Sequence, residues 1–145
     1  MLGGLFVTPS VTAIAEALRS AAATGRVAVI GNAKIASALG ASHDVVPVAL
    51  SARAAKRHPN AVGDVAALEP RSLGAVVALG ITDEDAWARS LDAWSRAVRD
   101  GGAIVLVDRG HAPEASRRAL CGGLTELEQR RAGRVIVTSG LVTHL

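Results

Sequence analysis

The sequence predicts an α/β domain built on a doubly wound, mostly parallel sheet of seven strands, with an antiparallel last strand. Three observations predict this fold. Helical and strand patterns alternate along the chain, which is typical of a parallel sheet covered by helices on both faces. Residues 91–110 read as a helix, a Gly-Gly turn and an apolar strand ending in Asp108. The final strands, at 124–129 and 134–142, have no helix between them and predict a terminal hairpin.

Before the hairpin, the expected elements are a helix at 11–23, a strand at 26–30, a helix at 32–39, a strand at 44–50, a basic helical turn at 51–58, a minimal strand at 61–63, a strand at 74–81, a helix from 82 to the turn at 100–102, a strand at 103–107 and a helix at 113–120. Residues 65–73 form a loop or short helix.

Capping residues and prolines set several of these boundaries. Ser10 follows Pro9 as the expected N-cap of the first helix, and residues 1–8 then form an apolar arm ahead of it. Thr82 caps the later helix, whose first turn carries the acids Asp83, Glu84 and Asp85. Pro47 places its strand near the sheet edge, because proline donates no hydrogen bond to a neighbouring strand.

Composition and length limit the possible function classes. The chain of 145 residues is half hydrophobic and one-fifth charged (50% and 20%), which predicts one globular domain over 1–145. Cys121 is the only cysteine, which excludes an internal disulfide and a cysteine-based metal site. Four scattered histidines predict no other metal site. No apolar run reaches the length of a membrane span, and the N-terminus lacks the basic region of a signal peptide, so we expect a cytoplasmic protein.

Three segments resemble, in the right order, class I S-adenosylmethionine (SAM)-dependent methyltransferases. Residues 63–70 resemble the family's segment after the third strand, residues 91–108 its "helix, basic residue, Gly-Gly, strand" segment, and residues 123–128 the start of its sixth strand. The resemblance implies the strand order 3-2-1-4-5-7-6, the last strand antiparallel. It also implies a SAM site at the carboxyl ends of the first strands.

The segment expected to hold SAM departs from the family pattern. The family's glycine loop corresponds here to Gly31, Asn32 and Ala33, and only its first glycine is kept. Val29 stands in place of the family's acid, and Ile35 stands at a later glycine position. Added Cβ atoms at Ala33 and Ile35 are expected to obstruct the backbone approach. The second strand ends without the acid that holds the ribose hydroxyls in the family. Of the family's SAM contacts, only Asp64 remains, and we expect weak SAM binding or none.

Several candidate residues have two interpretations. Asp64 is either a ligand residue or the cap of the turn that follows it. Gly31 also begins a loose dinucleotide-binding pattern, but the missing acid weakens nicotinamide binding as much as SAM binding. A small anion could bind near Asn32, Ala33 and Lys34, although a solvated Lys34 is favoured. Trp87 and Trp94 are expected to pack in the core.

Two groups of cations could contact phosphates: Arg53, Lys56 and Arg57, and the hairpin residues Arg130, Arg131 and Arg134. Because the chain offers few aromatic residues to stack bases, we favour a solvated charged surface and do not expect a nucleic-acid partner.

The altered cofactor loop favours a non-catalytic protein-interaction or regulatory module with no cofactor. The alternative is an active SAM-dependent methyltransferase acting on a small molecule. Leu2, Leu5, Phe6 and Val7 in the expected arm predict contact with a protein partner or with a second copy of the chain.

Overall fold

The computed structural model describes residues 2–80 and 86–144, with side chains from Pro9 onward. Its elements are α1 (Leu2–Ser20), β1 (Val27–Ile30), α2 (Ala33–Leu39), β2 (Val45–Val48), α3 (Ala52–Ala55), the 3-10 helix η1 (Val65–Ala67), β3 (Leu73–Leu79), α4 (Trp87–Ala97), β4 (Val98–Asp108), α5 (Ala112–Cys121), β5 (Thr125–Ala132) and β6 (Val135–Leu141).

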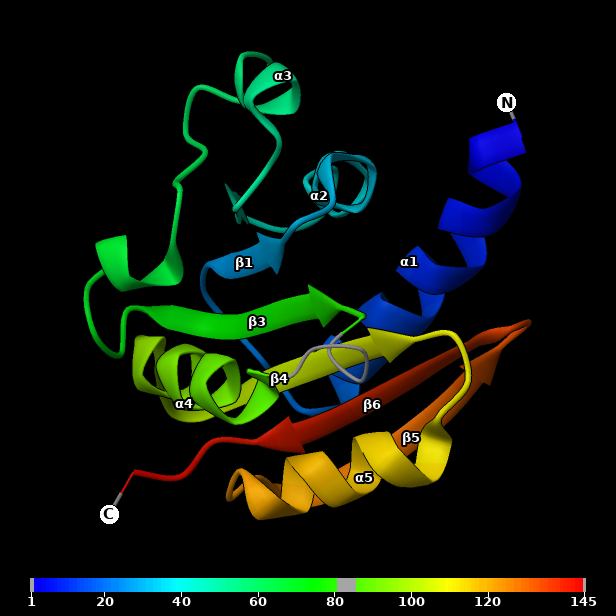
Figure 1. Ribbon diagram of the computed structural model, residues 1–145, viewed down its shortest axis with the longest axis vertical. Coiled ribbons are helices and arrows are strands. Elements are labelled where there is room, and N and C mark those ends of the chain that lie inside the picture. The colour runs from blue at the N-terminus through cyan, green and yellow to red at the C-terminus, as the bar shows by residue number, and fades with distance from the viewer. Residues whose placement is uncertain (1, 81–85, 145) are drawn as a thin grey trace.

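The strands form one mixed sheet in the order β2-β1-β3-β4-β6-β5 (Figure 1). β2, β1, β3 and β4 are parallel neighbours. β6 pairs antiparallel with β4, with Val107 opposite Val137, and β5 completes the hairpin. The predicted parallel sheet with an antiparallel last strand is therefore confirmed.

The expected third strand is reduced to a single bridge, so the prediction of seven strands was wrong. Val62 pairs with Val48 alone. Its N–H donates to the Pro47 carbonyl and its own carbonyl accepts from the Ala49 N–H, at 3.0 and 2.9 Å. Pro59 and Asp64 flank a segment of only a few residues, which is too short for a longer ladder.

The start of the first helix was also predicted wrongly. α1 begins at Leu2 and contains Pro9, so the expected arm is helical from residue 2 onward. Proline removes one intrahelical hydrogen bond at this point, but the helix continues through it. Beyond Pro9, α1 packs on the sheet through one face, formed by Ser10, Ala13, Ile14, Ala17 and Leu18. The expected cap at Thr82 and the acids at 83–85 lie outside the described residues.

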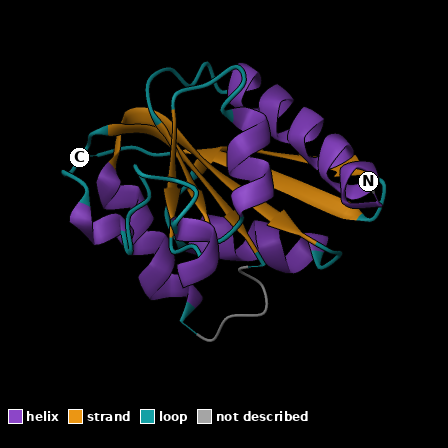
Figure 2. Cartoon of the chain, turned by 90° about the horizontal axis from the view of Figure 1, so that it is seen from above, coloured by secondary structure: helices purple, strands orange, loops and turns teal. Residues whose placement is uncertain are grey.

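Helices cover both faces of the sheet (Figure 2). β3 shows how one strand serves both layers, since Val76 and Ala78 pack on the side of α4 and α5, whereas Ala75 and Val77 pack on the side of α1 and α2. The core is almost entirely aliphatic, with Trp94 as its one buried aromatic residue among the described side chains. No helix in the described ranges is long and apolar enough to cross a membrane.

Candidate functional site

The candidate site lies at the carboxyl ends of β1 and β3. The chain passes from β1 to β2 on one side, and β3 then pairs with β1 on the other side. In open α/β sheets, ligands bind in a crevice outside the strand ends at such a change of direction.

Glycines leave both of these strands in the left-handed backbone region. Gly31 follows β1 with φ +75°, and Gly80 follows β3 with φ +74°. A Cβ atom added at either position would meet no atom within 4 Å. The sequence predicted Gly31 at this site but not Gly80, because Gly80 fell inside the strand expected at 74–81, whereas β3 ends at Leu79. Together they leave bare backbone at the crevice, where a ligand could approach.

Ile35 does not obstruct this loop, contrary to the sequence prediction. Its side chain is 3% exposed and packs in the core layer under α1 and α2. Ile35 lies within α2, so it has no need of a positive φ. Ala33, the first residue of α2, is half-buried.

Three polar residues at this edge cap the elements that follow them. The Asn32 side chain accepts from the Ile35 N–H at 2.9 Å, Ser51 Oγ accepts from the Ala54 N–H at 3.2 Å, and Asp64 Oδ1 accepts from the Ala66 N–H at 3.0 Å. The structure thus gives Asp64 the capping role, one of its two interpretations. The side chain is exposed.

The exit of β2 carries no carboxylate. Ala49 follows the strand directly, is exposed and has φ +56°. Leu50 is half-buried, and Ser51 is committed to capping α3. At the end of β4, Asp108 is 2% exposed. The residues directly after β1 and β2, at 31–33 and 49–51, therefore include no carboxylate.

A separate open hollow of about 450 Å³ lies beside the amino end of β2 and the end of α2. Its lining comprises Ala36, Ser37, Gly40, His43, Asp44, Val45, Pro47, His58 and Asn60. Among the described residues, no group of three or more His, Cys, Asp or Glu side chains is arranged to hold a metal ion.

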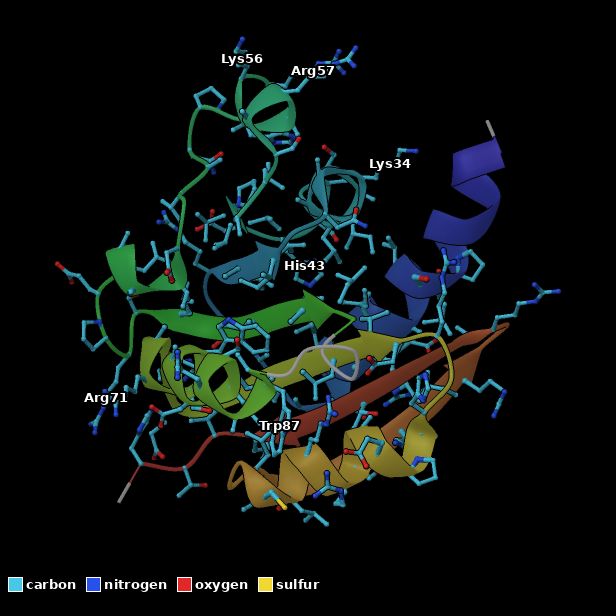
Figure 3. The ribbon with its side chains drawn as sticks, viewed as in Figure 1. Lys34, His43, Lys56, Arg57, Arg71 and Trp87 are labelled. Atoms are coloured by element: carbon cyan, nitrogen blue, oxygen red, sulfur yellow. The ribbon has the colours of Figure 1, made fainter. Side chains whose placement is uncertain are left out.

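The two tryptophans lie on the same face of α4. Trp94 is 7% exposed and packs in the core, as expected. Trp87 is half-buried, packs against the core layer and lies beneath the guanidinium groups of Arg117 and Arg118. Figure 3 shows it between α4 and α5.

The structure separates the predicted cations by their partners. Arg130 is half-buried and pairs with Glu16 of α1 at 3.7 Å and with Glu128 at 3.0 Å. Arg131 and Arg134 beside it are exposed, as are Arg53, Lys56 and Arg57 around α3.

Comparisons with known proteins agree with this fold. No protein-family model matches the sequence, and no curated protein matches it significantly. Among solved structures, the chain is similar to a SAM-dependent methyltransferase from Thermotoga maritima, which is described as a possible histamine N-methyltransferase. The two share 14% identity with a TM-score of 0.72, and the match covers 97% of this chain and 92% of that one.

Two further structures match at similar identity. One is a TehB-like SAM-dependent methyltransferase from Corynebacterium glutamicum, with 19% identity, a TM-score of 0.63, and coverage of 87% of this chain and 85% of that one. The other is the 16S rRNA N2 G1207 methyltransferase RsmC of T. thermophilus, with 20% identity and a TM-score of 0.63, where 83% of this chain covers only 36% of that one. The chain therefore has the fold of class I SAM-dependent methyltransferases.

Proposed function

We propose that this chain is a non-catalytic interaction or regulatory module that keeps the methyltransferase fold but does not use SAM. The observation that carries the proposal is the exit of β2, where Ala49 and Leu50 stand in place of a carboxylate. Ribose hydroxyls donate strong hydrogen bonds to a charged acceptor. A ribose bound at this position would lack those hydrogen bonds. Asn32 and Ser51 use side-chain oxygens to cap α2 and α3.

The test restores the missing charge. Ala49→Asp places a carboxylate at an exposed position directly after β2. The backbone there has a positive φ, which aspartate tolerates better than most residues do. Ala49→Asn keeps that tolerance without the charge and is the matched control. We expect calorimetry to find no micromolar SAM or S-adenosylhomocysteine binding to the wild type or to the Asn variant, and stronger binding to the Asp variant. Micromolar SAM binding by the wild type, or transfer of a labelled methyl group to a small molecule, would overturn the proposal.

A second candidate, an active SAM-dependent methyltransferase acting on a small molecule, has two observations in its favour. Gly31 and Gly80 leave open backbone on both sides of the crevice, and Asp64 remains exposed at the same sheet edge. The labelled-methyl assay above separates this candidate from the first.

The partner of a non-catalytic module would be a protein or a second copy of the chain. We propose that the first two turns of α1, with Leu2, Leu5, Phe6 and Val7, take part in this contact. Support comes from their apolar residue types, because burial of apolar surface is the main favourable term in most protein association.

A further inference from the structure

Exposed cations gather at the carboxyl edge of the sheet from four different strand exits. Lys34 follows β1, Arg53 follows β2, and Arg109 follows β4 directly. The hairpin adds Arg131 and Arg134, because Arg131 pairs with Ile136 and Ile136 pairs with Asp108 at the end of β4. We call these five residues the carboxyl-edge cations. All five are exposed, and within the part of the chain that the structure describes none of them forms an ion pair.

Several other cations are paired or hydrogen-bonded where they lie. Arg26 pairs with Asp44 at 3.4 Å, Arg96 pairs with Asp92 at 3.1 Å, and Arg99 donates to Thr24 Oγ1 at 2.7 Å. Arg117 and Arg118 share Glu114. Of the exposed cations without an ion pair among the described residues, the carboxyl-edge cations with Lys56 and Arg57 form the majority, and Arg19, Arg71 and Arg89 lie outside this group. Figure 3 shows Lys34, Lys56 and Arg57 around α2 and α3, with Arg71 far from them at the other end of the sheet.

Few carboxylates offset this charge. Asp108 is buried, and Asp64 is exposed but caps η1. Asp83, Glu84 and Asp85 follow β3 in the sequence and lie outside the described residues. Among the described residues, the carboxyl-edge cations together with Lys56 and Arg57 outnumber the exposed acids at these strand exits.

The spread of the cations limits what could bind them. Neighbouring strands lie about 4.8 Å apart, so the exits of β2 and of the hairpin are separated by about 20 Å. A single phosphate or a small metabolite cannot reach both groups. An extended polyanion can, and a nucleic-acid strand carries a phosphate about every 3.4 Å.

We propose that the carboxyl edge binds the phosphate backbone of a nucleic acid. Arginine, which supplies four of the five cations, matches phosphate with a planar fork of N–H donors. Among described aromatic side chains, Trp94 is buried in the core and Trp87 is covered by arginines, so the contact is to the backbone and independent of base sequence. The sequence did not favour such a partner, because it could not show that separate basic groups share one edge. The proposal holds whether or not SAM binds.

The test compares two variants that lose the same charge. Arg131→Gln/Arg134→Gln removes carboxyl-edge cations, whereas Arg19→Gln/Arg71→Gln removes exposed cations near the amino ends of the strands. Fluorescence anisotropy would use a labelled single-stranded RNA of about 20 nucleotides and the matching DNA duplex. We expect the first variant to bind about tenfold more weakly, with a slope of log K against log salt lower by about 1 for each lost phosphate contact. The control should stay within about twofold of the wild type.

Three results would overturn the proposal. They are the absence of saturable binding at low salt, an equal loss in the control variant, and equal competition by polyglutamate at the same charge concentration, which would indicate an acidic protein partner. Binding of RNA alone, of DNA alone or of both supports it and identifies the source of the phosphates. Circular dichroism of each variant checks that these exposed substitutions leave the fold intact, and repeating the titration with SAM separates this result from the cofactor question.

Discussion

The guanidinium carbon of Arg118 lies 5.2 Å from the centre of the Trp87 ring. Arg117 approaches the same ring at 6.0 Å, so the start of α4 is held against α5 by one aromatic ring and two cations. Such contacts contribute about 0.5–1 kcal/mol each at partly exposed positions.

Replacing Trp87 should therefore weaken the α4–α5 contact. We expect Trp87→Ala to lower the free energy of unfolding by about 2–3 kcal/mol, combining lost burial with both cation–π contacts. Trp87→Phe should cost about 1 kcal/mol, since a smaller ring remains. Urea denaturation followed by circular dichroism measures both values. Equal losses in the two variants would argue against a role for the ring.

Glu114 should make stability depend on pH in the acidic range. Hydrogen bonds from Arg117 and then Arg118 lower its pKa from 4.5 to about 2, and the Arg118 Nε–Glu114 Oε1 distance is 2.9 Å. The folded state thus favours the carboxylate, so this contribution is complete above the unfolded pKa and is lost as pH falls from about 4.5 to about 2. Thermal melts should show the wild type above Glu114→Gln at pH 7, with the gap closing across that interval. A constant gap down to pH 2 would contradict the assignment.

Gly74 should tolerate no side chain. A Cβ atom there would lie 1.9 Å from the Thr24 carbonyl oxygen and 2.7 Å from its carbon. We expect Gly74→Ala to destabilise the fold by more than about 3 kcal/mol or to prevent folding, as overpacking against backbone does. Gly31→Ala is the control, with φ +75° but open space, and should cost about 1–2 kcal/mol. Thermal melts of both variants measure these losses of stability, and equal losses would contradict the clash at Gly74.

The first two turns of α1 should mediate association. A chain shortened to begin at Thr8 keeps the packed face from Ser10 to Leu18 and leaves Pro9 in the first turn, where proline is well tolerated. Light scattering should find that the full chain self-associates and the shortened chain does not. If both are monomeric, a pull-down from native lysate that recovers the same proteins with both chains would contradict a role for this segment.

Much of the fold could be predicted because its patterns are local. Consecutive residues alone indicate the apolar strand β3 and the hairpin at the end of the chain. The prediction of a third strand was wrong because the number of backbone hydrogen bonds around Val62 depends on the neighbouring strand β2. The start of α1 was predicted wrongly because proline, which loses a hydrogen bond and clashes with the preceding turn, usually marks a helix boundary, whereas here Pro9 lies inside the helix.

The candidate site was less predictable, because it depends on side-chain direction. The family resemblance puts Ile35 at a glycine position of the loop, but its position within α2 turns its side chain into the core. The sequence left Asp64 with two possible roles, and its capping bond to the Ala66 N–H required the structure. The association of Arg109 with Arg131 and Arg134 required the register of β4, β6 and β5, which no local pattern encodes.

The single bridge at Val62 also affects how the molecule behaves in a crowded solution. β2 would otherwise present a row of free backbone groups to any extended segment of another chain. Pro47 has no N–H to offer, its carbonyl is taken by Val62, and the Asn60 side-chain amide donates to the Val45 carbonyl at 3.1 Å. A short bridge, a proline and one asparagine thus protect this end of the sheet from strand addition and fibril growth, without a full seventh strand.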